Sequence, residues 1–170
     1  MDEIDLRILD LLQRDARLTV NDIAERIHLS PTPVWRRIQK LEEDGVITGR
    51  VALLDPAKLQ VGVTVFAAIR TNQHNAAWLE RFARAVDAMP EVVEVYRMSG
   101  DVDYLLRIVV PDIAGYDAVY QKLIRSVDVF DVSSSFAMER LKSTTALPLH
   151  FVRTERARAA RAPRVRRARK

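Results

Sequence analysis

The feature that most constrains the fold is residues 30–47, SPTPVWRRIQKLEEDGVI, which carry the signals of one complete helix. Ser30 can cap this helix through its hydroxyl, and Pro31 suits the first helical position, where an N–H would have no partner. The buried side is predicted by apolar residues at helical spacing, Val34, Ile38 and Leu41. Gly45 predicts the end of the helix, because glycine readily adopts the backbone conformation that terminates one.

The other side of this helix is polar and basic. Arginine can donate two hydrogen bonds to a guanine edge, and threonine can contact bases or phosphate, so this side suits the DNA major groove. The predicted DNA-contacting residues are Ser30, Thr32, Trp35, Arg36, Arg37, Gln39 and Lys40. Trp35 has two interpretations. It either lies beside the sugar–phosphate backbone of DNA or fills the seam between this helix and the expected wing, and we favour packing in the seam. Any surface helix can carry basic residues, so this helix alone does not establish DNA binding. The segments that precede it decide whether it belongs to a DNA-binding domain.

Two further helices are expected before residue 30, the second of them short. An apolar stripe predicts the first at about residues 2–14, formed by Ile4, Ile8, Leu11 and Leu12. Thr19, with Asp22 three residues later, forms a capping-box pattern at the start of the second, which we expect at about residues 20–27. His28 and Leu29 then form a tight turn. Three helices with this short turn predict a helix-turn-helix domain over residues 1–50, whose third helix enters the DNA groove.

Residues 46–54 favour β structure and are expected to form a small wing or a linker strand. Asp55 and Pro56 interrupt this pattern, so residues 51–60 are predicted to link two domains. The order strand, helix, two strands, helix, strand then predicts an α+β, ferredoxin-like βαββαβ domain over residues 61–145. The expected strands are residues 61–71, 92–98, 104–110 and 127–141, and the expected helices are residues 75–89 and 113–124.

In this second domain Trp78 is predicted to lie in the core, and Val93, Val95 and Arg97 are expected to share one face of their strand. Two helices would cover one face of the four-stranded antiparallel sheet and leave the other face uncovered. Because a sheet with apolar groups on both faces needs a partner, self-association is expected.

Charge is unevenly distributed along the 170 residues, whose net charge is +4. The basic tail, residues 153–170, has nine basic residues and one acidic residue, whereas the rest of the chain is net negative. We expect residues 146–170 to be a disordered extension. Such a polycation can also act as an arm that binds DNA phosphates without regard to sequence. Both interpretations stay open, because a disordered arm can still bind.

Several other classes of protein are disfavoured. No apolar run is long enough to cross a bilayer, the acidic N-terminus does not resemble a signal peptide, and there are no cysteines, so we expect a cytoplasmic protein. His28, His74 and His150 lie far apart, and no nucleophile, phosphate-loop or metal-binding motif is evident. Asp101 and Asp103 could form a carboxylate pair, but alternating acids are common in turns. We therefore expect no enzyme, no metal and no cofactor.

The helix-turn-helix pattern, residues 30–47, the βαββαβ order and the run SGDVDYLL together resemble the Lrp/AsnC family of transcription regulators over roughly residues 2–142. The runs VALLDPAKL, SSSFAMERLK and TTALPL are most similar to its DecR-type subgroup, regulators of cysteine detoxification. The resemblance implies a homodimer formed through the second domain, commonly assembled into octamers, with an amino-acid effector bound where dimers meet. The basic tail has no counterpart in this resemblance.

The family's effector loop corresponds here to Ser99, Gly100, Asp101, Asp103 and Tyr104, with Ser133, Ser134 and Ser135 on the last strand. Asp103 would hold the ammonium group of a small amino acid, with L-cysteine as the first candidate. Gly100 would allow close approach of the backbone, and the serines would supply donors to the ligand carboxylate. The alternative is that the loop is only a hairpin turn, since Gly-Asp is common in turns.

These observations predict a sequence-specific regulator that binds double-stranded DNA and responds to an amino acid. The runner-up is a non-specific architectural DNA-binding protein, which the basic tail favours. A haem-pathway decarboxylase-like enzyme is a lesser alternative, because some proteins that resemble this family are such enzymes.

Overall fold

The computed structural model describes residues 1–153, which divide between two compact units. Among the described residues, the first unit holds residues 1–52 together with residues 142–153, and the second holds Leu53–Leu141. The polypeptide therefore passes between the units twice. In the described part of the chain, no helix has the length and apolar character needed to span a bilayer.

The first unit contains the three predicted helices, α1 (Glu3–Arg14), α2 (Val20–Ile27) and α3 (Pro31–Glu43), and confirms the helix-turn-helix. The predicted capping box of α2 is present, because Thr19 accepts from the Asp22 amide and the Asp22 carboxylate accepts from the Thr19 amide. Asp2 and Asp5 form a second capping box at the start of α1. The core of this unit comprises Ile8, Leu9, Leu12, Ile23, Ala24, Ile27, Val34, Ile38 and Leu41.

Both ends of α3 are set by backbone geometry. His28 adopts the left-handed conformation at the end of α2, with φ of 60°, so the chain can turn sharply into α3. At the other end Gly45 has φ of 69°, and the Val46 amide donates back to the Leu41 carbonyl over 2.9 Å. The expected Ser30 cap is not formed: Ser30 occupies the capping position, but its hydroxyl makes no capping hydrogen bond. Pro31 at the first helical position leaves fewer amides there to cap.

The strand or wing predicted for residues 46–54 is absent from the structure. The amides of Val46 and Ile47 both donate to the Leu41 carbonyl, which folds this segment back onto α3. Val51, Leu53 and Leu54 are more than 70% exposed. A β-prone segment needs a neighbouring strand for its backbone hydrogen bonds, and no strand within residues 1–153 pairs with these residues.

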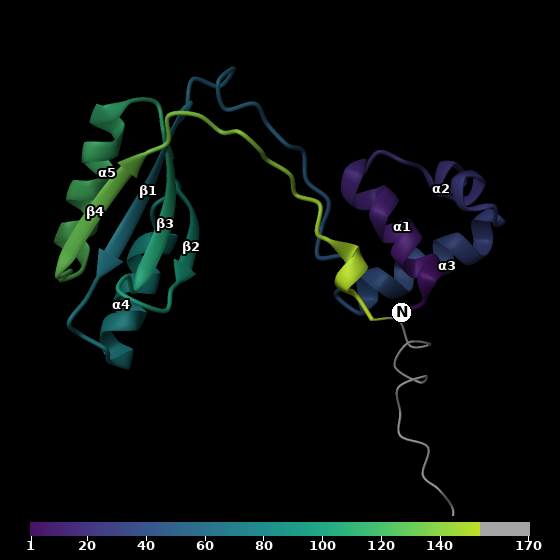
Figure 1. Cartoon of the computed structure of the whole chain (residues 1–170), viewed down its shortest axis with the longest axis horizontal. Coiled ribbons are helices and arrows are strands. Elements are labelled where there is room, and N and C mark those ends of the chain that lie inside the picture. Colours follow the sequence, from purple (N-terminus) through teal and green to yellow (C-terminus); the bar gives the residue numbers. More distant parts are fainter. Residues whose placement is uncertain (154–170) are drawn as a thin grey trace, which may run out of the picture. The chain divides into compact units, whose positions relative to one another are not determined.

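The second unit confirms the ferredoxin-like βαββαβ domain. Its elements are β1 (Val63–Arg70), α4 (Ala76–Asp87), β2 (Val92–Arg97), β3 (Tyr104–Val110), α5 (Ile113–Ser126) and β4 (Asp131–Phe136). The strands are antiparallel in the order β2-β3-β1-β4, so β1 lies between β3 and β4 (Figure 1). Along β3 every second residue is buried, which is the alternation expected when helices cover only one face.

The core of the second unit is built around aromatic side chains. Trp78 is 1% exposed and stacks on Phe82 with ring centroids 5.1 Å apart, which confirms its predicted core position. Its indole N–H donates to the Asp128 carbonyl over 2.7 Å, which ties α4 to the loop before β4. Truncating a buried aromatic of this kind typically costs about 3–5 kcal/mol.

Two strand predictions need correction. The last strand covers Asp131–Phe136 rather than residues 127–141, because its partner β1 pairs with it only between Val65 and Arg70. In β2 the register shifts between Val92 and Glu94, so Val93 is an extra, bulged residue without a partner on β3, and the regular pairing runs only from Glu94 to Arg97. A bulge depends on pairing with β3 and has no signal in the strand itself.

Candidate nucleic-acid interface and effector region

The DNA-binding face predicted on α3 is held outward by the burial of its opposite side. Val34, Ile38 and Leu41 are at most 4% exposed, so the side chains about half a turn away must face solvent. Thr32 and Arg36 are both exposed there. Within residues 1–153, Arg36 makes no ion pair or side-chain hydrogen bond, and its five N–H donors are available to a ligand.

Arg37 has a different role from its neighbour. Its guanidinium donates to the carboxylates of Asp2 over 2.8 Å and Asp5 over 2.6 Å, and its side chain is only 32% exposed. The hydrogen bond to Asp5 raises the pKa of Arg37 above its ordinary value, so Arg37 keeps its positive charge. Arg37 therefore fastens α3 to the start of α1 and is not presented to DNA as Arg36 is.

The remaining residues of the predicted set are partly engaged within the helix. Trp35 is 52% exposed and is not part of the core of this unit, so it does not fill a seam as expected. The Gln39 amide donates to Glu42 over 3.1 Å, and the Lys40 ammonium lies 3.2 Å from the Asp44 carboxylate. Exposed pairs of this kind contribute at most about 1 kcal/mol and can exchange for DNA contacts.

In the second unit, the predicted effector loop is a turn between β2 and β3. Gly100 has φ of 108°, a conformation that favours glycine. The Asp103 carboxylate accepts a hydrogen bond from the Thr71 amide over 2.8 Å, and its other oxygen lies 4.0 Å from the His74 ring. Asp103 thus fixes the end of β1 with one oxygen. Ser99 and Asp101 are exposed, whereas Tyr104 is buried in the core.

The three serines on β4 do not form one set. Their strand pairs with β1 at Phe66, Ala67 and Ala68, so Ser133 and Ser135 lie on the uncovered face of the sheet. Ser134 lies on the helix side, where its hydroxyl and the Tyr116 hydroxyl form a hydrogen bond. Because β1 lies between β3 and β4, the turn and these serines flank β1 on opposite sides.

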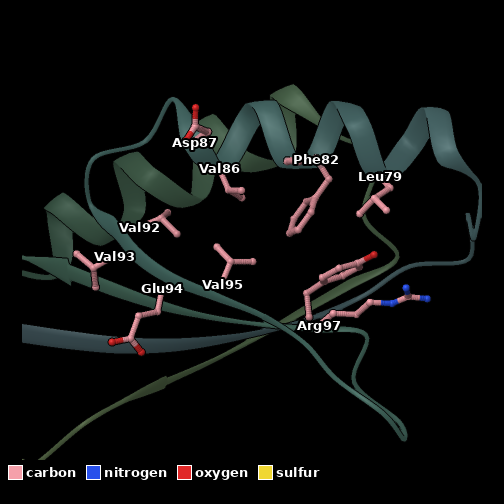
Figure 2. A pocket seen from close by; sticks show the side chains of 11 residues that line it. Leu79, Phe82, Val86, Asp87, Val92, Val93, Glu94, Val95 and Arg97 are labelled. Carbon is pink, nitrogen blue, oxygen red and sulfur yellow. The ribbon is translucent and has the colours of Figure 1, made fainter. Parts of the chain in front are cut away.

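A groove of about 400 Å³ lies between α4 and β2. Figure 2 shows that Phe82 and Val86 point from α4 toward Val95, whereas Asp87 and Arg97 extend outward. The groove is therefore apolar, and the charged groups at its edges are not directed into it. An amino acid needs partners for both an ammonium and a carboxylate group, so this groove is a poor match for one.

The uncovered face of the sheet carries a polar cluster that the sequence did not indicate. Glu94 accepts from Arg107 over 2.6 Å and from the Tyr96 hydroxyl over 2.8 Å. These hydrogen bonds, first that from Arg107, hold the pKa of Glu94 below its ordinary value, and the one from Tyr96 raises the pKa of Tyr96. Only the register of β2 on β3, with its bulge, brings the three residues together.

Comparison with known proteins identifies a family domain in each of the two units. A model of winged helix-turn-helix DNA-binding domains matches residues 1–48, and the Lrp/AsnC ligand-binding domain matches residues 64–147. A glutamate uptake regulatory protein of Zymomonas mobilis is 50% identical over 149 residues, 88% of this chain and 91% of that protein. The DNA-binding transcriptional activator DecR of Escherichia coli is 47% identical over 150 residues, 88% of this chain and 99% of that protein.

Solved structures extend the match to three dimensions. An AsnC family transcriptional regulator from Agrobacterium tumefaciens is 60% identical, with a TM-score of 0.86 over 89% of this chain and 99% of that chain. A transcriptional regulator from Neisseria meningitidis, solved in complex with L-Met, is 34% identical with a TM-score of 0.84 over the same shares of the two chains. The chain belongs to the Lrp/AsnC family of DNA-binding transcription regulators, which carry an amino-acid ligand-binding domain.

Proposed function

We propose that this regulator recognises a specific DNA sequence through the exposed side of α3, with Arg36 as the main base contact. The observation that carries the proposal is the contrast between two neighbouring arginines. Arg37 is bound to Asp2 and Asp5 and positions α3, while Arg36 is exposed on the outer side with its donors uncommitted among the described residues. An arginine held in this way can make the bidentate guanine contact that gives sequence preference.

A selected operator tests this proposal. Duplexes bound by the full chain would be selected from a random pool, and the affinity for the selected site would be compared with that for scrambled DNA at one salt concentration. Sequence-specific binders prefer their sites by about a thousandfold or more. Equal affinity for both duplexes would favour the alternative of a non-specific architectural protein, for which the charge of the basic tail is the supporting observation.

We further propose that the second unit binds a free amino acid at the turn of residues 99–104, with Ser133 and Ser135 of β4. The family model and the relative solved with L-Met support an amino-acid ligand. Gly100 leaves room beside the backbone, and the second oxygen of Asp103 can accept from an ammonium group. Ser134 is not part of this proposed site, because its hydroxyl is bound to Tyr116.

The effector is best identified by a thermal-shift screen of the full chain against all free amino acids, with L-cysteine as the first candidate. A ligand that binds only the native state raises the melting temperature by mass action. Similarity to the cysteine-responsive subgroup favours L-cysteine. A shift with a different amino acid would replace it, and no shift with any of them would contradict the effector proposal.

Self-association through the uncovered face of the sheet is also proposed. That face presents Phe66, which is 38% exposed, and Tyr96, which is 51% exposed, together with Leu105 and Val109. A second copy would cover these side chains, and further assembly to an octamer would complete the effector site. Sedimentation of the wild type and of Phe66→Asp tests this: the substitution is expected to shift the protein toward monomer. A regulator of this kind would act on the chromosome in the cytoplasm.

A further inference from the structure

The segment that follows the second unit returns to the DNA-binding unit and pairs with α1. Gln13, in the last turn of α1, accepts from the Leu147 amide over 2.8 Å through its side-chain oxygen. Its side-chain nitrogen donates to the Leu147 carbonyl over 3.2 Å. One glutamine thus satisfies both backbone groups of a residue 134 positions away, in the manner of a neighbouring β-strand.

Packing reinforces this backbone contact. Leu149 is partly buried against the core of the helix-turn-helix unit, whereas Leu147, two residues earlier, is 71% exposed. Leu149 begins a short 3₁₀-helix, Leu149–Phe151. Together with His150 it lines a cavity of about 370 Å³, whose other walls are residues of α1 and α2. We call residues 146–151 the docking segment.

The docking segment is joined to β4 by residues 137–145. Met138 is 96% exposed and Leu141 is 88% exposed, so this connection does little packing of its own. Nine residues span at most about 30 Å when fully extended. The DNA-binding unit is therefore attached to the effector domain by two chain segments, the one before β1 and this one after β4.

We propose that the docking segment is a working part of the DNA-binding unit and couples α1 to β4, so that effector binding at β4 acts on α3. This rests on the proposed effector site, which includes Ser133 and Ser135. The coupling path is physical: the docking segment contacts the C-terminal end of α1 at Gln13, and Arg37 of α3 is bound to Asp2 and Asp5 at the other end of the same helix. The structure shows the docked segment, and its release from α1 would supply the second state that such coupling needs.

The chain offers a matched pair of substitutions for the test. Leu149→Ala removes a side chain that packs on the unit, and Leu147→Ala removes an exposed one from the same segment while keeping the backbone contact. Gln13→Ala removes the paired hydrogen bonds and leaves the core intact, so it serves if Leu149→Ala does not fold. All variants are made in the full chain.

Hydrogen exchange reports docking directly. Amides in the last turn of α1 should exchange about tenfold faster in Leu149→Ala and Gln13→Ala than in the wild type, because the local opening becomes easier. Leu147→Ala should match the wild type. Equal exchange rates in Leu149→Ala, Gln13→Ala and Leu147→Ala would refute the claim that residues 146–151 dock on α1.

Coupling is measured as the change in affinity for the selected operator on adding L-cysteine or L-methionine. The ratio of affinities with and without amino acid should fall to one in Leu149→Ala and stay at the wild-type value in Leu147→Ala. A ratio retained in Leu149→Ala would refute the coupling. If an amino acid raises the wild-type melting temperature but does not change operator affinity, the coupling fails and the proposed effector site stands. If no amino acid raises the melting temperature, the proposed effector site fails with the coupling, and hydrogen exchange still decides whether the segment docks.

Discussion

Arg36 and Arg37 differ by one position and therefore by 100° around α3. This angle gives them different roles: we propose that Arg36 contacts DNA, whereas Arg37 positions α3 against α1. Arg37 falls near the buried side, within reach of the carboxylates of Asp2 and Asp5, while Arg36 falls on the exposed side of the helix. Both are arginines, so residue type alone does not distinguish them. The difference arises from which residues fold against each one.

Arg36→Ala is expected to weaken binding to the selected operator while leaving the melting temperature unchanged. Loss of a bidentate base contact costs about 1–3 kcal/mol and relaxes the preference at one base position. Fluorescence anisotropy with the operator and with single-base variants measures both effects. Unchanged operator affinity in a normally folded variant would show that another side of α3 faces the DNA.

Arg37→Ala should give the opposite result, a lower melting temperature as its primary effect. The substitution leaves the carboxylates of Asp2 and Asp5 without their cation, and we expect a loss of about 1 kcal/mol, since the pair is only partly shielded from solvent. Calorimetry measures the change. A variant that melts like the wild type but no longer binds the operator would place Arg37 in the DNA-contacting set after all.

At the scale of elements, two polar contacts lie at the margins of the sheet, one at a strand end and one on the edge strand β2. Asp103 in the turn before β3 closes the end of β1 through the Thr71 amide, and Thr71 is only 7% exposed. At the edge strand β2, a bulge sets Glu94 opposite Arg107. In both places a polar side chain makes the key contact: Asp103 accepts from the backbone at the end of β1, and Glu94 accepts from Arg107 beside the bulge.

Asp103→Ala is expected to lower the melting temperature, because the Thr71 amide loses its acceptor. A buried donor left without a partner costs about 1–3 kcal/mol. Asp101→Ala, in the same turn but exposed, is the control and should melt like the wild type. If the thermal shift with amino acid persists in Asp103→Ala, the proposed role of Asp103 in holding the ammonium group must be withdrawn, and its role is structural.

The Glu94–Arg107 pair predicts a dependence of stability on pH. Because the pKa of Glu94 is lowered in the folded protein, its contribution is complete above the ordinary glutamate pKa of about 4.3 and is lost as pH falls through the lower folded value. Glu94→Gln should therefore melt lower than the wild type at pH 7, by less than about 1 kcal/mol for so exposed a pair. The difference should vanish in strongly acidic solution, and a difference that persists there would rule out the ion pair as its cause.

At the scale of the whole molecule, charge is segregated along the chain. The basic tail carries nine cations, while the rest of the chain is net negative. In that part of the chain, the cations predicted to contact DNA lie on α3. The disorder predicted for residues 146–170 is wrong for residues 146–151, because Leu147 is hydrogen-bonded to Gln13 and Leu149 packs on the first unit. Beyond Arg153 that prediction lies outside the described residues. A polycation near DNA contributes affinity by releasing counterions, irrespective of base sequence.

Deletion of residues 153–170 is expected to weaken binding to every duplex by a similar factor and to reduce the salt dependence of binding. Each phosphate neutralised contributes about 0.9 to the slope of log affinity against log salt. Titrations of operator and scrambled DNA at several salt concentrations measure both quantities. An unchanged affinity and slope would mean that the tail does not contact DNA.

The sequence by itself determined the elements and their order. Residues 30–47 contain the apolar spacing and terminating glycine of α3, and the capping box of Thr19 and Asp22 marks α2, because these signals act within one or two turns of chain. The βαββαβ order likewise followed from local periodicity. The family resemblance added the proposed effector residues, which the structure places in the turn between β2 and β3 and on β4.

The tertiary structure alone decided which of these residues are free and which are bound within the fold. Nothing near Arg37 in the sequence indicates that Asp2 and Asp5 will bind it, and nothing near Gln13 indicates a partner 134 residues away. The bulge at Val93 and the separation of Ser134 from Ser133 and Ser135 depend on strand register. Local patterns specify helices and strands, whereas these contacts arise only when distant segments meet, so the folded chain alone shows them.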